Sequence, residues 1–330
     1  MSTIDQDITI KQTLEYSLNK ETSDIGIYYG KTGELLLYGL CSSQNQSVID
    51  VSLHYIIETL PSISSFDFPR GLTGIGFGLQ YLSDLKLLPV DKNIIFQYLD
   101  DKIYSDIANN QSTDLSLLSD KSVLARTLYF YSRLQSLNEP NFYRSFAIRE
   151  CLILLTTEIK ELISIIIVNR DVLLINRPEF YAEIGQCFNV LYYILLLNIN
   201  KNYCQDLLLL IRGFICDCFE DKNVWNDLNA PFLLRLLYFY TNVSFEVNDR
   251  YMKDCAIKWV QSFGSFFRDS MKTDLDICFF NQLNALIGCN INFSYSAKII
   301  SDIDSFVLSK YIISFLKQKM CDKSLLQITI

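Results

Sequence analysis

The chain has 330 residues, of which 50% are hydrophobic and 20% are charged, so it can bury a large core and is not an intrinsically disordered protein. Its 29 Lys and Arg against 37 Asp and Glu give a net charge of −8, which argues against a nucleic-acid-binding surface and against attraction to an anionic membrane. With only 12 glycines and 6 prolines, it has too few turn-forming residues for a β-sandwich or β-barrel.

Residues 1–20 lack the pattern of a secretory signal, because Asp5, Asp7 and Glu15 interrupt them and no basic stretch leads into an apolar one. No uncharged apolar run in the chain reaches about 18 residues, so we expect no membrane insertion. We therefore predict a cytoplasmic protein whose 10 cysteines are reduced and mostly buried. The C-x-C pair of Cys216 and Cys218 has no second pair beside it, and we expect it to be structural.

Helical periodicity runs along nearly the whole chain, with apolar residues at intervals of three and four. The segments with this spacing are 46–60, 71–82, 94–103, 123–134, 152–166, 190–197, 207–215, 231–240 and 283–289. Polar or Pro-containing stretches separate them, among them 61–69, 109–114, 138–141, 169–178 and 221–229. The pattern predicts an all-α protein, either a bundle, a solenoid or an α/α toroid. No low-complexity linker divides the chain, so we predict a single domain over residues 1–330.

Two of the predicted helices begin with the same glycine pattern. Gly30 and Gly33 bracket the first copy, and Gly71, Gly74 and Gly76 form the second, which begins 41 residues later. Glycines at a helix start let the backbone approach a neighbouring helix or a ligand closely. Several such starts around one centre would present free N–H groups and positive dipole ends. The pattern is compatible with either role, packing or ligand binding.

The stretch from Gly71 to Leu82 resembles the repeat G-L-x-G-I-x-x-x-L-x-x-L of the lanthionine synthetase C-like (LanC-like) family, and Gly30 to Leu40 resembles a looser copy. The resemblance implies an α/α toroid, in which up to seven inner helices begin with these motifs and as many outer helices surround them. It also implies that Gly30, Gly33, Gly71, Gly74 and Gly76 are repeat-motif glycines.

Active members of that family are zinc enzymes that add a peptide cysteine thiol to a dehydrated serine or threonine. Two cysteines and one histidine hold the zinc, which lowers the pKa of the substrate thiol. The resemblance places the first ligand motif at Trp225 to Pro231, where Asn226 stands in place of the cysteine, or Asp227 if the register is shifted by one residue. It places the second at Cys278, with Phe279 in place of the histidine. The stretch from Tyr181 to Gly185, where the family has a further histidine, contains none.

Cys278 is therefore the only surviving candidate among the expected zinc ligands. A rebuilt cation site could use Asp227, Asp274 and Asp276 with Cys278, although a polar loop would have the same sequence. We expect no cofactor, or zinc if the site is rebuilt, and the sequence names no catalytic residue. His54 is the only histidine in the chain and falls in a predicted outer helix, so we expect it in a structural or surface role.

Aromatic residues are abundant, with 20 Tyr and 22 Phe. Tyr29, Tyr81, Glu183 and Trp225 lie on or near predicted inner helices, and we predict that they line a groove able to hold a peptide. For each one alone, ordinary packing in a large helical core is the alternative.

These features predict a zinc-deficient LanC-like pseudoenzyme of lanthipeptide-type modification, which binds or scaffolds a precursor or leader peptide and works with other peptide-modifying enzymes. One alternative is an active lanthionine cyclase with an unusual metal site. The other is an α/α-toroid enzyme acting on a carbohydrate or isoprenoid. Carboxylate pairs such as Asp100-Asp101 and Glu220-Asp221 could serve that enzyme as acid and base, or could be solvated helix ends.

Overall fold

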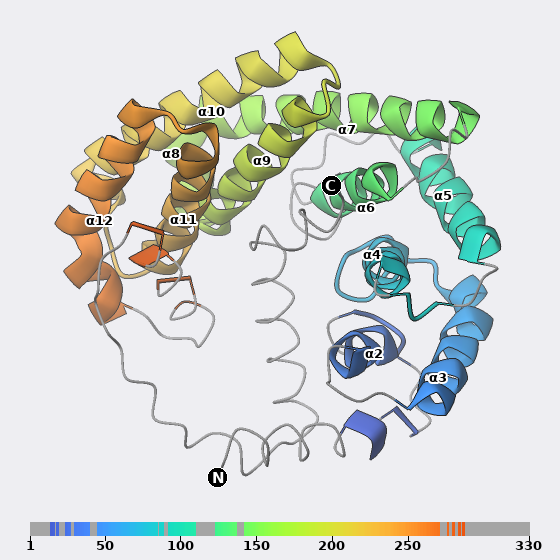
Figure 1. The fold of residues 1–330 in the computed structure, drawn as a ribbon. Coiled ribbons are helices and arrows are strands. Elements are labelled where there is room, and N and C mark those ends of the chain that lie inside the picture. Colours follow the sequence, from blue (N-terminus) through green and yellow to red (C-terminus); the bar gives the residue numbers. More distant parts are fainter. Residues whose placement is uncertain are drawn as a thin grey trace. The chain divides into compact units, whose positions relative to one another are not determined.

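The computed structural model describes residues 14–16, 18–19, 24–27, 30–39, 45–84, 86–88, 92–109, 123–136, 142–270, 276, 279–280, 283–284 and 286–287. Across these residues the secondary structure is helical without strands, which confirms the predicted all-α class (Figure 1). The helices are α2 (Lys31–Gly39), α3 (Gln46–Thr59), α4 (Leu72–Asp84), α5 (Lys92–Asn109), α6 (Val123–Gln135), α7 (Phe142–Val168), α8 (Arg170–Asn176), α9 (Glu179–Leu196), α10 (Lys201–Glu220), α11 (Ala230–Val247) and α12 (Arg250–Ser270), with short 3-10 turns η1 (Leu60–Ser62) and η3 (Lys222–Val224).

Two parts of this arrangement differ from the sequence prediction. The stretch 169–178, predicted as a loop, contains helix α8, and the segment 250–270 forms α12 although its periodicity was not singled out. Of the predicted helix over 283–289, residues 283, 284 and 286 are helical and residue 287 lies in a turn, whereas residues 285, 288 and 289 lie outside the described residues. Of the helices that are described, not one combines the length and the apolar character needed to cross a membrane.

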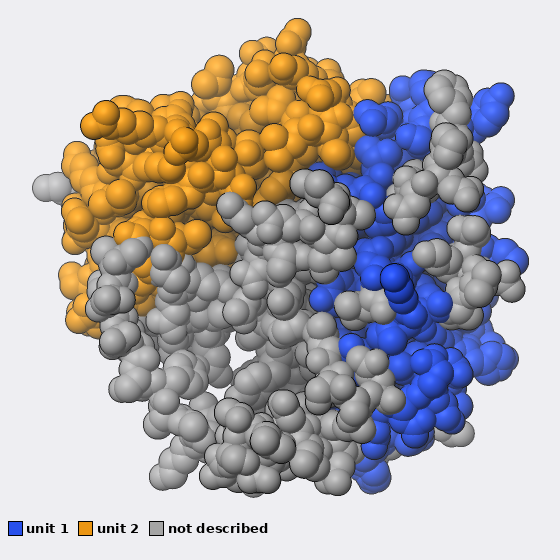
Figure 2. Space-filling view, viewed as in Figure 1, with its two compact units in different colours: residues 1–111, 120–151, 297–330 blue, residues 112–119, 152–296 orange. Residues whose placement is uncertain are grey.

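The chain divides into two compact units, shown in Figure 2. Unit 1 comprises residues 1–111, 120–151 and 297–330, and unit 2 comprises residues 112–119 and 152–296. The boundary falls inside α7, whose first part belongs to unit 1 and whose longer second part belongs to unit 2. The prediction of one domain over the whole chain stays a prediction.

Within unit 1, buried helices alternate along the chain with half-exposed ones. Helix α4 packs against both α2 and α6, and it is buried along nearly its whole length. Helix α3 covers α2, and α5 covers α4 (Figure 1). Because α3 buries only one face, through Ile49, Leu53 and Ile56, its other face is left to solvent.

Unit 2 repeats the same scheme. Helices α9 and α11 pack against each other, α10 covers α9, and α12 covers α11. Helix α9 buries almost every residue from Phe180 to Ile194, whereas α12 buries a single stripe that includes Met252, Ala256 and Val260. In each unit, buried helices are therefore covered by helices that bury one face. Closure of the helices into a toroid stays a prediction.

The repeat-motif glycines lie where backbones approach closely. A Cβ atom on Gly30 or Gly71 would lie 2.5 Å from a backbone atom of the segment before the helix, and one on Gly74 would overlap the carbonyl group of Phe68. Gly33 lies in the first turn of α2, where its N–H donates to the carbonyl of Gly30 at 3.1 Å. The predicted crowding at these helix starts is therefore confirmed for Gly30, Gly71 and Gly74.

Two further glycines of α4 admit neighbouring helices. A Cβ atom on Gly76 would lie 2.5 Å from Cε2 of Tyr129 in α6, and one on Gly78 would lie 2.5 Å from Cγ2 of Thr32 in α2. The described atoms that occupy these spaces belong to the protein itself, which favours the packing role of the glycines over the ligand-binding role.

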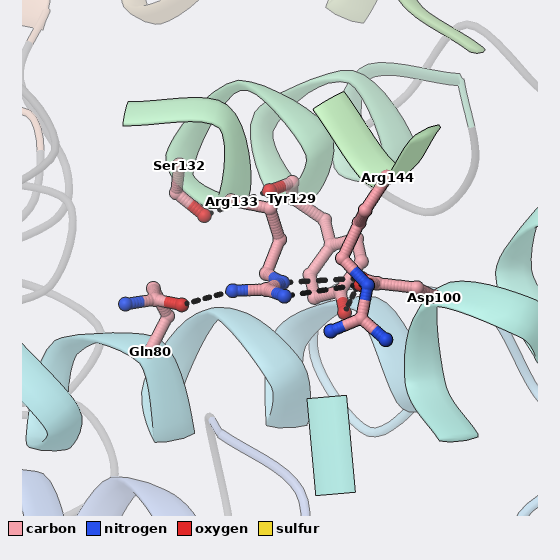
Figure 3. Close-up of polar contacts among 6 residues, drawn as sticks. All are labelled: Gln80, Asp100, Tyr129, Ser132, Arg133 and Arg144. Atoms are coloured by element: carbon pink, nitrogen blue, oxygen red, sulfur yellow. Dashed lines mark hydrogen bonds and ion pairs between the residues drawn. The ribbon is translucent and has the colours of Figure 1, made fainter. Parts of the chain in front are cut away.

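A buried polar cluster joins α4, α5, α6 and the start of α7 in unit 1 (Figure 3). Arg133 donates from Nε and Nη2 to the two carboxylate oxygens of Asp100 at 3.1 and 3.0 Å, and from Nη1 to Oε1 of Gln80 at 2.9 Å. The hydroxyl of Tyr129 donates to Oδ1 of Asp100 at 2.6 Å, and Nε of Arg144 lies 3.9 Å from Oδ2. We call these five residues the unit 1 polar cluster.

The unit 1 polar cluster is structural, because its charges and hydrogen-bonding groups satisfy one another. Asp100 is only 7% exposed and lies in the middle of α5, so the expectation of a solvated helix end was wrong, and Asp101 beside it is exposed. Burial, followed by the negative charge of Asp100, holds the pKa of Tyr129 well above its usual range. A neutral phenol donating to a paired carboxylate adds to the network and leaves no group free for chemistry.

Candidate functional site

The segment in which the resemblance places the first zinc motif forms an ordered turn before α11. The side-chain oxygen of Asn226 accepts from the backbone N–H groups of Leu228 and Asn229 at 3.1 and 3.0 Å. Asp227 is exposed, and its Oδ1 accepts from the hydroxyl of Ser270 at 3.2 Å. The two candidate positions therefore have local structural partners.

In the second motif, the described residues pack into an aromatic and ionic cluster. Asp276 is 1% exposed, and its carboxylate pairs with Nη2 of Arg235 at 2.9 Å. Phe279 is 4% exposed, and its ring centroid lies 5.1 Å from that of Tyr238 and 6.0 Å from that of Phe239.

Cys278, like Asp274, lies outside the described residues. Within the described ranges, no three or more His, Cys, Asp or Glu side chains come together as a metal-binding group.

The residues predicted to form a peptide groove belong to different parts of the molecule. Tyr29 lies outside the described residues. Tyr81 is buried in the second half of α4 in unit 1, and burial followed by the charge of Asp84 raises its pKa. Glu183 is buried in α9, and Trp225 is half-buried before α11, both in unit 2. Neither of these two lines the pocket of unit 2, and the peptide groove stays a prediction.

Trp225 instead belongs to an aromatic stack that attaches the segment before α11 to α12. Its ring lies over Phe263 at a centroid distance of 3.5 Å and an interplanar angle of 10°, and against Phe219 at 5.2 Å. His54 is exposed, and its Nε2 lies 3.1 Å from a carboxylate oxygen of Glu58 one turn along α3. That location agrees with the expected surface role.

The described part of unit 2 contains a pocket of about 440 Å³, a volume typical of small-ligand sites. Helix α8, the start of α9, the end of α10, the turn η3 and the segment just before α11 form its walls. Leu174, Ile175 and Leu228 give it an apolar side, and the rim is open, since Ile175 is 80% exposed and Leu228 is 76% exposed. We call this cavity the unit 2 pocket.

Charged side chains of the unit 2 pocket are mainly acidic. Arg170 lies 3.5 Å from Oδ1 of Asp171 through Nε, and 3.5 Å from Oδ2 of Asp217 through Nη1. Asp221 is a third carboxylate in the lining, and one of its oxygens accepts from the N–H of Asn223 at 2.9 Å. Among the lining side chains that the structure describes, one guanidinium group therefore faces three carboxylates, and the sum of their charges is negative.

Tyr181 provides the most buried polar group of the unit 2 pocket. Its side chain is 3% exposed and its ring stacks on Phe214, with the centroids 6.4 Å apart. No described residue forms a hydrogen bond with its hydroxyl group. Burial, followed by the neighbouring Cys218 and Asp221, raises the pKa of this phenol, so it is neutral at pH 7 and can both donate and accept.

Cys218 adds a buried thiol to the lining of the unit 2 pocket. Burial raises the pKa of its thiol far above its usual range, so the reactive thiolate is scarce at neutral pH. Cys218 is buried and Cys216 is half-buried, which agrees with the structural role expected for the C-x-C pair. The pocket is equipped for binding through carboxylates, a phenol and apolar side chains.

Comparisons of the chain with protein-family models, with curated proteins and with solved structures give no match. The likeness to the LanC-like family therefore rests on the motif residues themselves.

The unit 2 pocket was not predicted from the sequence. Its acidic residues come from α8, from α10 and from the residue that ends α10, and no local spacing links them. Tyr181 stands in the stretch where a family histidine was looked for, and that was the one signal pointing to this place.

Proposed function

We propose that this protein is a LanC-like protein of lanthipeptide-type modification that has lost its zinc centre and acts as a peptide-binding or scaffolding subunit. Two observations support the family. The glycine motifs begin buried helices, α2 and α4, and buried helices alternate with covering helices in each unit. Both are what a double layer of inner and outer helices requires.

The observation that carries the loss of zinc is the occupation of the ligand positions. Asn226 caps the turn before α11, and Phe279 packs among Tyr238 and Phe239 next to the ion pair of Arg235. A phenyl ring has no lone pair for zinc, and an amide already used as an acceptor is a poor replacement for a thiolate.

The partners in this proposal are a precursor or leader peptide and the other enzymes that modify it. The proposed location is the cytoplasm. It is supported by the cysteines among the described residues, which are free thiols: Cys151, Cys187, Cys204, Cys216, Cys218 and Cys255.

Metal analysis and a cyclisation assay test the proposal together. Purified protein should carry less than about one zinc in ten chains, because one cysteine alone binds zinc weakly. A synthetic peptide with one dehydroalanine and one cysteine should bind in a calorimetric titration and should close its thioether ring no faster than it does without protein. Stoichiometric zinc that is lost in Cys278→Ala, together with faster ring closure, would establish the active cyclase instead.

A carbohydrate-directed enzyme is the second candidate, because Asp171, Asp217 and Asp221 line one pocket of unit 2. Two carboxyl groups at a glycosidic bond are the minimum for hydrolysis. A panel of oligosaccharides tests it, and activity that disappears in Asp217→Asn, without any peptide binding, would replace the scaffold proposal.

A further inference from the structure

We propose that the unit 2 pocket binds the ammonium group of a lysine side chain carried by an apolar peptide segment. This inference rests on the proposed function, since it takes the ligand to be a peptide. It adds which side chain of the peptide is recognised and where.

Charge selects a cation. Asp171, Asp217 and Asp221 line the pocket, and Arg170 is the one basic side chain among the lining residues whose side chains the structure describes. The guanidinium of Arg170 lies 3.5 Å from two of those carboxylates, so it offsets part of their charge. A carboxylate or phosphate ligand would face a net negative lining, whereas a cation would restore neutrality.

Tyr181 supplies an independent observation that points to a ligand. The Tyr181 side chain is 3% exposed and lines the cavity, and its hydroxyl has no hydrogen-bond partner among the described residues, so the hydroxyl is available to a ligand. An ammonium group has three N–H donors and no acceptor. Three acceptors for these donors line the cavity. Asp217 comes from α10, Asp221 from the end of α10, and the hydroxyl of Tyr181 from α9.

The apolar side of the pocket suits the rest of a lysine side chain and its neighbours. Leu174 lines the wall, and Ile175 and Leu228 stand at the rim with more than three quarters of their surface exposed. Val172, on the same short helix, is also exposed. The four methylene groups of lysine would cover the wall, and apolar residues flanking the lysine would cover the rim.

Two matched peptides test the inference on the full-length protein. The first is a short acetylated and amidated peptide with one lysine between leucines, and the second replaces that lysine by norleucine, which keeps the aliphatic stem and removes the ammonium. In calorimetric titrations the lysine peptide should bind at least about tenfold more tightly than the norleucine peptide, since hydrogen bonds to a charged group are lost in the second.

Three variants assign the effect to the pocket. Tyr181→Phe keeps the ring stack and should lower the affinity for the lysine peptide by about tenfold, while leaving the affinity for the norleucine peptide unchanged. Asp217→Asn should lower the affinity for the lysine peptide by about fivefold. Asp254→Asn removes the same charge from an exposed position on α12, outside the pocket lining, and should change neither affinity. Unfolding midpoints of all variants should match the parent protein.

The outcomes separate this inference from the proposed function. Equal affinities for the two peptides, or a lysine preference that survives both Tyr181→Phe and Asp217→Asn, would overturn the lysine pocket while peptide binding stands. If neither probe peptide binds but other sequences from a peptide library do, the lysine pocket is again overturned and peptide binding stands. Failure of every peptide would overturn the proposed function as well.

Discussion

The unit 1 polar cluster and the unit 2 pocket are built from the same residue types and yet serve different ends. Each has a buried tyrosine near aspartate and arginine side chains. In the cluster, Tyr129 donates to Asp100 at 2.6 Å and Arg133 forms two hydrogen bonds with the same carboxylate. In the pocket, Arg170 lies 3.5 Å from its carboxylates, and Tyr181 has no hydrogen-bond partner among the described residues. What distinguishes a structural network from a binding site is therefore whether its groups satisfy one another.

The largest effect should come from breaking the cluster. Asp100→Asn would leave Arg133 buried without its counter-charge, and we expect the free energy of unfolding to fall by about 3–5 kcal/mol. Denaturant unfolding followed by circular dichroism measures it. Asp101→Asn, on the exposed side of the same helix, is the matched control and should stay within about 0.5 kcal/mol of the parent. Equal losses in the two variants would mean that the cluster is not what holds unit 1.

A second test addresses the close packing at the start of α4 in unit 1, without changing a charge. Gly74→Val would drive its side chain into the carbonyl group of Phe68, and should lower stability by about 1–3 kcal/mol. Gly213 is the control, because a Cβ atom there would have no neighbour within 4 Å. Gly213→Ala should leave stability unchanged or raise it by up to about 1 kcal/mol. An unchanged denaturation midpoint for Gly74→Val would refute the close approach.

The two tyrosines should respond differently to loss of their hydroxyl groups. Tyr129→Phe removes a hydrogen bond to a buried carboxylate and should cost about 1–2 kcal/mol, whereas Tyr181→Phe removes none and should cost less than about 0.5 kcal/mol. Comparable losses of unfolding free energy in the two variants would mean that the two hydroxyl groups do not differ in hydrogen bonding.

The cost of Tyr129→Phe should also depend on pH. Because the pKa of Tyr129 is raised in the folded protein, the stability that its neutral form confers is fully present below the unfolded-state pKa of about 10 and declines as the pH rises above it. The gap in unfolding free energy between parent and variant should be constant from pH 7 to about 9 and should narrow above about pH 10. A gap that widens above pH 10 would contradict the sign of the shift.

The smallest effect on stability should come from Arg170. Its ion pairs are long and half-exposed, so Arg170→Gln should change the free energy of unfolding by less than about 0.5 kcal/mol. The same variant makes the unit 2 pocket more negative, and it should raise the affinity for the lysine peptide by about two- to threefold. Weaker binding in Arg170→Gln would show that the arginine takes part in recognition.

Helix identity was predictable from the sequence because apolar periodicity is a local signal. The predicted segments 46–60 and 123–134 nearly coincide with α3 and α6. Helix α7 extends ten residues before the predicted 152–166, to Phe142, where exposed residues such as Tyr143 and Phe146 obscure the pattern. The short helix α8 was missed because polar residues and Pro178 around it are typical of a loop.

The candidate site was less predictable for a physical reason. Whether a carboxylate is paired depends on residues far away in the chain, as Asp100 shows with Arg133, 33 positions later. The glycine motifs were informative because a missing side chain constrains its immediate surroundings. The role of Tyr181 depends on what fails to reach its hydroxyl, and no sequence pattern records that.

Tyr129 has a consequence for how substitutions should spread through related sequences. Its ring fills the space left by Gly76, and its hydroxyl binds Asp100. A methyl group at position 76 would displace the ring of Tyr129 and thereby break the hydrogen bond between its hydroxyl and Asp100. A steric clash in α4 would therefore remove a polar contact between α5 and α6. We expect positions 76, 100 and 129 to covary as a set: any homologue with a larger residue at 76 should also have replaced both the tyrosine and the aspartate.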